Sequence, residues 1–457
     1  MSSIAPVLAR AASQRDRHVA ELIEFLRIPS VSADSRRRDD MGRCAEFVAA
    51  KLTAAGMAAR VFATDGHPIV YGELLGAPGR PTVLVYGHYD VQPPDPLELW
   101  TSPPFEPRID GENVYARGAA DDKGQVYTHI KAVEAYRDAG IPLPVNVKFL
   151  IEGEEEVASV HLDDFLEREK KRLACDVVVI SDTNQFAPGI PAITYGLRGL
   201  TYMEMRVDGP ERDLHSGAFG GALVNPATAL AAILTSLKDA GGRILIPGFH
   251  DDIVPLAKWE REMWATLPFD EEEFRKIAGS PRLTGETGYS TLERRWARPT
   301  LEINGIYGGY QGEGAKTVIP AWAGAKISMR LVPNQDPTRI AELFERAVAD
   351  RCPEGARVST TRLSGGKPVL VAVDSAEMRA ASRAIERGFG KKPVLIRTGG
   401  SIPVVASFKE TLGADSLLVG WGRPDDNCHS PNEKFHLGDF QKAIETSAIL
   451  FAELGEA

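Results

Sequence analysis

Three short apolar segments constrain the fold of this chain more than any other feature. TVLVY (82–86), VNVKFLI (145–151) and DVVVI (176–180) are too uniformly apolar for half-exposed strands. Longer amphipathic stretches separate them, and residues 123–139 have the apolar spacing of a helix. This alternation predicts an α/β fold, in which a mixed, mostly parallel sheet is flanked by helices.

The pattern changes at Leu200, where LTYMEMRVDG alternates as a half-exposed strand does. NPATALAAILTSLKDAGG predicts a helix that ends in glycines, and WAGAKISMRLVP predicts another alternating strand before a helix over 338–350. The α/β pattern resumes after about residue 370. Because 457 residues exceed what one core usually organises, we expect two domains. These are an α/β domain over 1–199 and 370–457, and an inserted α+β domain over 200–369.

Charge and composition exclude several classes of function. The net charge is −10 and no run of Lys and Arg occurs, so nucleic acid is not an expected partner. The first residues lack the apolar stretch of a signal peptide, and no apolar run reaches the roughly 18 residues of a membrane span. The four cysteines are far apart and fit no disulfide framework. We therefore predict a cytoplasmic protein without a membrane partner.

Acidic and histidine side chains follow the ends of the apolar segments. Strand-like runs lead into GHYD, EGEEE and SD, and a later run, SLLVGW, leads into GRPDDNCHS. A further segment, RGAADDKG, precedes the helix predicted from Lys123. The carboxyl ends of parallel strands share one edge of a sheet, where ligands bind in open α/β folds. The side chains predicted at this edge are His88 and Asp90, Asp121 and Asp122, Glu154 to Glu156, Asp182, and His429.

Carboxylates gathered so closely would raise one another's pKa unless a cation lay among them. Taken singly, each segment has an ordinary interpretation: DDKG as a helix N-cap, EGEEE as a solvated acidic turn, and His429 as a surface or core histidine. Their joint occurrence instead indicates a pair of metal ions, since zinc takes both His nitrogen and carboxylate oxygen. Spacing alone does not decide which glutamate of EGEEE is a ligand and which is a base.

With these residues, the chain resembles the co-catalytic zinc peptidase superfamily of carnosinase-type dipeptidases, glutamate-releasing carboxypeptidases and aminoacylases. The segments DLHSGAFGG and MRLVPNQ are closest to the cytosolic dipeptidase branch. The resemblance covers nearly the whole chain, because its motifs occur in the family's order. They are YGHYDVQP, RGAADDKG, EGEEE, ISD, DLHSGAFGG, MRLVPNQ, TGGSIPV and CHSPNE.

The resemblance implies two Zn²⁺ ions per subunit, with Asp121 bridging them. His88 and Asp182 would complete one site, and Glu156 and His429 would complete the other. Mixed His and carboxylate sites also accept Mn²⁺ or Co²⁺.

The resemblance also implies roles beside the metals. Asp90 would orient the His88 ring, and Glu155 would be the general base for a hydroxide that bridges the ions and attacks the peptide carbonyl. Ala158 departs from the family, which often has glycine there.

The inserted domain would act as a lid and dimerisation domain of a homodimer. His215 resembles a histidine that reaches across the dimer interface to stabilise the oxyanion. Arg330 resembles the residue that pairs with the substrate carboxylate, with Thr317 as a further substrate contact. Backbone N–H groups of Gly399, Gly400 and Ser401, before a helix near Pro403, could receive the same carboxylate.

The expected function is therefore metal-dependent hydrolysis of dipeptides or short peptides. Asp182 favours this branch, because the carboxypeptidase and deacylase branches tend to carry Glu at that position. An amidohydrolase of N-acyl or N-carbamoyl amino acids, or a carboxypeptidase, would use the same metals. An inactive metal-binding scaffold is a further alternative, against which the presence of Glu155 and Asp90 argues.

Overall fold

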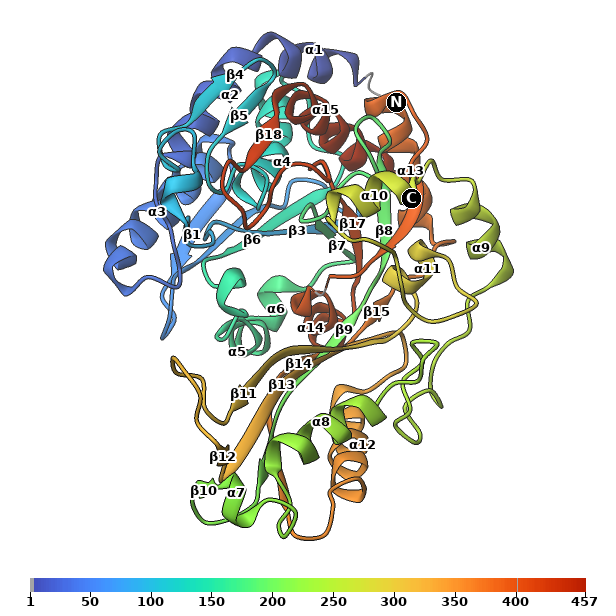
Figure 1. Cartoon of the computed structure of the whole chain (residues 1–457). Coiled ribbons are helices and arrows are strands. Elements are labelled where there is room, and N and C mark those ends of the chain that lie inside the picture. Colours follow the sequence, from blue (N-terminus) through green and yellow to red (C-terminus); the bar gives the residue numbers. More distant parts are fainter. Residues whose placement is uncertain (1–3, 401) are drawn as a thin grey trace. The chain divides into compact units, whose positions relative to one another are not determined.

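The computed structural model describes residues 4–400 and 402–457 (Figure 1). The chain forms two compact units. Unit 1 comprises Met1–Tyr195, Val371–Ile396 and Ser407–Ala457, and unit 2 comprises Gly196–Leu370 and Arg397–Ala406.

Unit 1 contains the mixed sheet that the apolar segments predict. Its central strands β6, β3, β7 and β17 pair in parallel, while β1, β2 and β8 join them as antiparallel strands. The strand order is β1-β2-β6-β3-β7-β17-β8, and β16 also pairs with β8. The strands are β1 (Ala58–Phe62), β2 (Ile69–Leu74), β3 (Thr82–His88), β6 (Asn146–Glu152), β7 (Val177–Ile180), β8 (Ala192–Leu197), β16 (Val394–Thr398) and β17 (Asp415–Val419). The predicted α/β class is confirmed.

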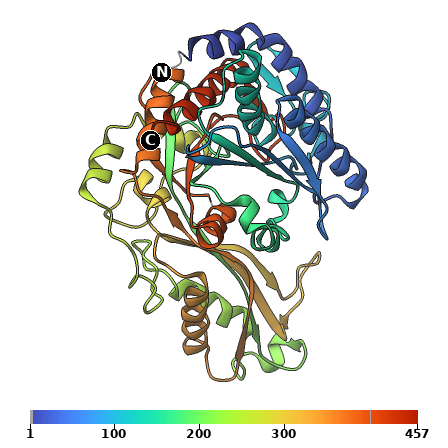
Figure 2. The same ribbon diagram turned by 180° about the vertical axis from the view of Figure 1, so that it is seen from behind.

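Helices cover both faces of this sheet, which is why its central strands are apolar throughout. Gly87 on β3 faces Val126 of α4, whereas its neighbour Tyr86 packs against Phe408 of α14. Figures 1 and 2 agree that α15 lies beside α4. The helices of this unit are α1 (Ala5–Ser13), α2 (Arg15–Leu26), α3 (Arg38–Ala54), α4 (Lys123–Asp138), α5 (Leu162–Arg168), α6 (Lys170–Leu173), α13 (Ala376–Phe389), α14 (Pro403–Leu412, from Ser407 on) and α15 (Leu437–Leu454).

A smaller antiparallel sheet of unit 1 has the order β18-β5-β4. It pairs β18 (Lys434–His436) with β5 (Asn113–Tyr115), and β5 with β4 (Arg108–Asp110). In this sheet, β5, which precedes RGAADDKG, therefore lies beside β18, which follows CHSPNE.

Unit 2 is built on an antiparallel sheet with the order β11-β13-β9-β14. Residues of β9 alternate between buried and less buried positions, as the sequence predicts for LTYMEMRVDG. The buried set, which includes Met203, Met205 and Val207, shares one core with α8 and α12. The elements are β9 (Gly199–Asp208), β10 (Leu214–His215), α7 (Ser216–Phe219), α8 (Pro226–Ser236), α9 (Lys258–Ala265), α10 (Glu271–Ile277), α11 (Thr291–Trp296), β11 (Thr300–Gly308), β12 (Val318–Ile319), β13 (Trp322–Leu331), α12 (Pro337–Asp350), β14 (Arg357–Gly366) and β15 (Val369–Leu370).

Two details differ from the sequence prediction. Helix α8 ends at Ser236, before the glycines, because Lys238 forms a β-bridge with Ile244 and takes the backbone out of the helix. Residues 397–406 cluster with unit 2 although they lie inside the predicted α/β segment. Contacts with unit 2 begin at Arg397, whose buried guanidinium pairs with Glu260 of α9, and continue at Gly399 and Gly400, whose carbonyl oxygens accept from Arg198.

Within the described residues, no helix combines the length and the hydropathy that crossing a bilayer requires.

Candidate metal centre

The predicted ligands of unit 1 lie where its parallel strands end. His88 is the last residue of β3, and Asp182 follows β7 by two positions. Glu156 lies in a short 3₁₀ turn, Glu155–Val157, that follows β6, and His429 lies in the loop after β17. Asp121 precedes α4. Parallel pairing of these strands brings together side chains that are hundreds of residues apart in sequence.

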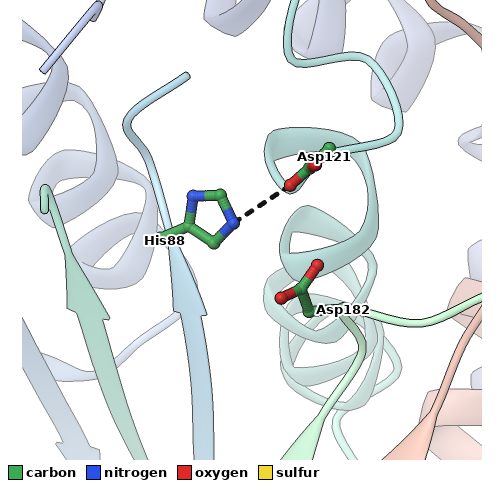
Figure 3. A group of neighbouring side chains, drawn as sticks. All are labelled: His88, Asp121 and Asp182. Carbon is green, nitrogen blue, oxygen red and sulfur yellow. Dashed lines mark ion pairs between the residues drawn. The ribbon is translucent and has the colours of Figure 1, made fainter. Parts of the chain in front are cut away.

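Asp121 lies between two histidines and turns a different oxygen to each. Its Oδ1 is 3.2 Å from His88 Nε2, and its Oδ2 is 2.9 Å from His429 Nε2. Figure 3 shows His88 and Asp121 directed toward one another, with Asp182 beside them. His429 Nε2 also lies 3.3 Å from Glu156 Oε2. One carboxylate thus has the arrangement that a bridging ligand requires.

Two groups of potential ligand atoms share this carboxylate. The first group is His88, Asp121 and Asp182, and the second is Asp121, Glu156 and His429. Within each group the atoms lie within 4.8 Å of one another. His88 Nε2 is buried and makes no well-aligned hydrogen bond among the described residues, although Asp121 Oδ1 lies 3.2 Å away, so this nitrogen can offer an electron pair to a cation once the ring is neutral. The residues present therefore fit a pair of ions.

The electrostatics of the cluster also require positive charge. Burial, followed by repulsion from Asp121, raises the pKa of Asp182 well above its ordinary value. Burial raises the pKa of Glu155 to about 7. Burial by itself would lower the pKa of His88, but its interactions with Asp121 and Asp90 raise it instead. Without a cation the cluster retains extra protons, which is how crowded buried carboxylates lower their repulsion.

Asp90 connects His88 to the turn that carries the glutamates. Its carboxylate lies 3.3 Å from His88 Nδ1 and accepts hydrogen bonds from the backbone N–H of Glu155 (3.2 Å) and of Glu156 (3.1 Å). The backbone oxygen of Asp90 is also 3.1 Å from His88 Nδ1. These contacts hold the ring with Nε2 toward Asp121, as an orienting residue does.

The three glutamates of EGEEE have different neighbours. Glu154 lies 2.8 Å from the ring of His161, and Glu156 accepts a hydrogen bond of 2.7 Å from Gln92 while facing His429. Glu155 belongs to neither group of ligand atoms. The turn closes through Ala158 at a φ of 74°, in the left-handed region, which glycine adopts at lower cost than alanine.

The predicted substrate residues of unit 2 form two groups. His215 and Thr317 lie on adjacent strand ends, because β10 pairs with β12 and the N–H of Ser216 donates to Thr317 O at 3.0 Å. His215 is exposed, and its Nδ1 accepts from the N–H of Gly217 at 2.9 Å.

The second group lies around Arg198. Its Nε donates to Gly399 O and its backbone N–H donates to Gly400 O, both at 3.2 Å. Burial, followed by repulsion from Arg330, lowers the pKa of Arg198 to about 10. Arg330, on β13, is therefore close enough for its charge to act on Arg198. Ser401 lies outside the described residues.

Sequence reasoning missed Gln92 and Arg198. Gln92 belongs to the motif YGHYDVQP, and its position four residues after His88 is the signal that it lies near the centre. Arg198 follows the buried strand β8, the same kind of strand-end position that identified the metal ligands.

Metal affinity of this centre should increase with pH. The His429 ring donates hydrogen bonds to Asp121 and Glu156, which raises its pKa to about 10, so this ring carries a proton at neutral pH in the metal-free protein. The contacts of His88 with Asp121 and Asp90 also raise its pKa. A ligand imidazole must be neutral, so binding releases protons, and affinity should rise about tenfold per pH unit for each proton released. Competition with a calibrated chromophoric zinc chelator between about pH 6 and pH 8 measures this slope.

The matched control is His429→Asn, which removes one titrating ligand and should give a smaller slope at lower affinity. A zinc affinity that stays constant over the interval would contradict the electrostatic account.

Comparison with known proteins identifies the family. The chain matches the model of peptidase family M20/M25/M40 over residues 84–453. It is 36% identical to the Cys-Gly metallodipeptidase dug1 of Schizosaccharomyces pombe, over 96% of each chain. It is 35% identical to the Beta-Ala-His dipeptidase of Homo sapiens, over 95% of this chain and 85% of that protein. The solved M20 family metallo-carboxypeptidase Sso-CP2 from Sulfolobus solfataricus is 34% identical, with a TM-score of 0.85 over 96% of this chain and 99% of that one. As the motifs predicted, the chain belongs to peptidase family M20/M25/M40.

Proposed function

We propose that this protein is a metal-dependent dipeptidase. The observation that carries the proposal is the position of Asp121, whose two oxygens face His88 and His429 beside the carboxyl group of Glu155. Two relatives, the Cys-Gly metallodipeptidase and the Beta-Ala-His dipeptidase, support dipeptides as the class of substrate.

His88, Asp121 and Asp182 would hold one ion, and Asp121, Glu156 and His429 would hold the other. Histidine nitrogens with carboxylate oxygens suit Zn²⁺, and Mn²⁺ or Co²⁺ could occupy the same ligands. When bound, such a pair polarises the scissile carbonyl and lowers the pKa of water.

Glu155 acts as the general base. It takes a proton from the attacking water and delivers it to the departing amine. Burial raises the pKa of Glu155 to about 7 in the metal-free protein, so this carboxylate has a higher proton affinity than an exposed glutamate. Glu154 is unsuited to this role, since its carboxylate is engaged by His161. Asp90 keeps the His88 ring in position.

Unit 2 supplies substrate contacts and the subunit interface. Arg330 and the backbone N–H groups of Gly399, Gly400 and Ser401 bind the substrate carboxylate, for which a guanidinium is well shaped. Thr317 contacts the substrate. His215, exposed on its own chain, stabilises the oxyanion in the other subunit of a homodimer. Residues 200–369 would then be the lid and dimerisation domain.

The proposed location of this protein is the cytoplasm. Cys44, Cys175, Cys352 and Cys428 are free thiols, which suits a reducing compartment.

Carboxypeptidase activity is the second candidate, because a metallo-carboxypeptidase is among the similar solved structures at 34% identity. A carboxypeptidase needs the substrate carboxylate but no free amine, so the two candidates differ in their tolerance of a blocked amino terminus.

Replacement of Glu155 by glutamine should leave the fold and zinc binding intact while lowering kcat by about 10² to 10⁴, because the amide cannot accept the proton. Steady-state kinetics on a free dipeptide measure the loss, and metal analysis checks that zinc is retained. Glu154→Gln is the matched control from the same acidic turn and should stay close to wild type. Near-native turnover of Glu155→Gln would rule out its role as base.

Mixed dimers can test whether His215 acts across subunits. His215→Ala should lower kcat by about 10² to 10³, the usual effect of losing one oxyanion donor. A co-expressed dimer of one His215→Ala subunit and one Glu155→Gln subunit should recover about half of the wild-type activity, because one active site then has both groups. Differently tagged subunits allow its purification. Activity no higher than in either parent, or a monomeric protein, would refute the arrangement.

A panel of matched substrates tests the function itself. Metal-stripped protein should be inactive, and protein reloaded with zinc or manganese should cleave free dipeptides but not their N-acetylated forms or N-acyl amino acids. Product amines are quantified by chromatography. Cleavage of N-acetylated dipeptides would indicate a carboxypeptidase, cleavage confined to N-acyl amino acids would indicate an amidohydrolase, and no metal-dependent hydrolysis would leave the scaffold alternative.

A further inference from the structure

The carboxylate of Glu433 has a position that the proposed reaction does not use. Its side chain is fully buried, with 0% of its surface exposed. Four N–H donors surround it. Oε2 accepts from Arg117 Nη1 and Gly118 N, both at 2.8 Å, and Oε1 accepts from Ala120 N at 2.9 Å and Asp121 N at 3.1 Å.

These donors all belong to the segment that leads into Asp121. The residues after Tyr115 and before Lys123 form no strand or helix, so the ladders of secondary structure do not satisfy their N–H groups. The Glu433 carboxylate accepts from the N–H groups of Gly118, Ala120 and Asp121, and its backbone oxygen accepts from Ala116 N at 3.0 Å. Glu433 therefore holds the path of the chain into Asp121 with both its side-chain and its backbone oxygens.

Glu433 also ends the loop that carries His429. It directly precedes β18, which is anchored by its pairing with β5. Just before it, Asn432 accepts from Thr101 N and donates to Leu99 O, both at 2.8 Å. Asn432 and Glu433, which make these contacts, thus lie within four positions of His429. The Nε2 atom of His429 is 2.9 Å from the Asp121 carboxylate.

We propose that Glu433 is a positioning residue of the metal centre, which holds the Asp121 segment and the His429 loop in the mutual arrangement that both ions need. The inference rests on the proposed metal-dependent function. It assigns Glu433 no contact with metal or substrate.

The clamp requires a carboxylate specifically. Each oxygen accepts from two N–H donors, so an amide would place its own NH₂ group against two donors at hydrogen-bond distance. Turning the amide over would only move its NH₂ group from one pair of N–H donors to the other. Aspartate would keep the charge but would be one methylene too short to reach all four donors.

Zinc affinity of the full-length protein tests the proposal independently of catalysis. Metal-stripped wild type, Glu433→Gln and Glu433→Asp are titrated with zinc against a chromophoric chelator. Glu433→Gln should bind zinc about 10- to 100-fold more weakly, the usual effect of losing a partner that orients metal ligands. Glu433→Asp should also bind more weakly than wild type, but less so than Glu433→Gln, because it restores the charge without the full geometry.

Glu453→Gln is the matched control. Glu453, on α15, is also a buried carboxylate of unit 1, 8% exposed, and it accepts from Arg383 and Arg387 at 2.6 Å each. Its replacement should lower the thermal unfolding temperature without changing zinc affinity. An equal loss of zinc affinity in Glu453→Gln would show a general effect of destabilisation and overturn the proposal.

Wild-type zinc affinity in Glu433→Gln would also overturn it. If Glu433→Gln does not fold, Glu433→Asp decides by itself, and wild-type affinity in that variant overturns the geometric argument. Hydrolysis is assayed separately: an inactive wild type that binds zinc normally would refute the proposed function and leave the comparison of affinities valid.

Discussion

The crowding of carboxylates at one edge of the unit 1 sheet is the constraint on which the rest of the centre depends. Asp121, Asp182, Glu155 and Glu156 lie among two histidines in a largely buried space, where like charges repel strongly. A shared cation would offset the repulsion between these carboxylates, because each of them is attracted to its positive charge. The cost of gathering these groups without metal is therefore the origin of the affinity for metal.

In this fold, one set of residues supplies the candidate metal ligands, and another set holds the backbone that carries those ligands. Parallel strands deliver His88 and Asp182 to the same edge, and buried acceptors then fix the backbone around them. Asp90 holds the glutamate turn and Glu433 holds the segment before Asp121, each through backbone N–H donors. These hydrogen bonds to the backbone matter because a metal ligand that is displaced by a fraction of an ångström loses much of its interaction with an ion.

Much of this could be predicted from sequence, because strand periodicity and strand-end chemistry are local signals. The segments that became β3, β6 and β7 were recognisable by their uniform apolarity, which reflects helices on both faces. Two features were not recognisable. The glycines after α8 suggested a longer helix than the structure has, because the chain turns back here so that Lys238 forms a β-bridge with Ile244, which the helical spacing of the apolar residues does not show. Residues 397–406 group with unit 2, where Arg397 pairs with Glu260, 137 positions earlier in the chain, and a contact over such a distance leaves no local pattern in the sequence.

The sequence by itself determined the class of fold, the identity of the candidate ligands and the family, since these follow from residue types in a fixed order. Only the tertiary structure decided that the two oxygens of Asp121 face different histidines, and that Glu154 is engaged by His161 while Glu155 is not. It alone brought Glu433 to Ala120, 313 positions earlier in the chain. The physical reason is that a hydrogen bond depends on distances of a few tenths of an ångström, which strand register and loop path set and which no local pattern encodes.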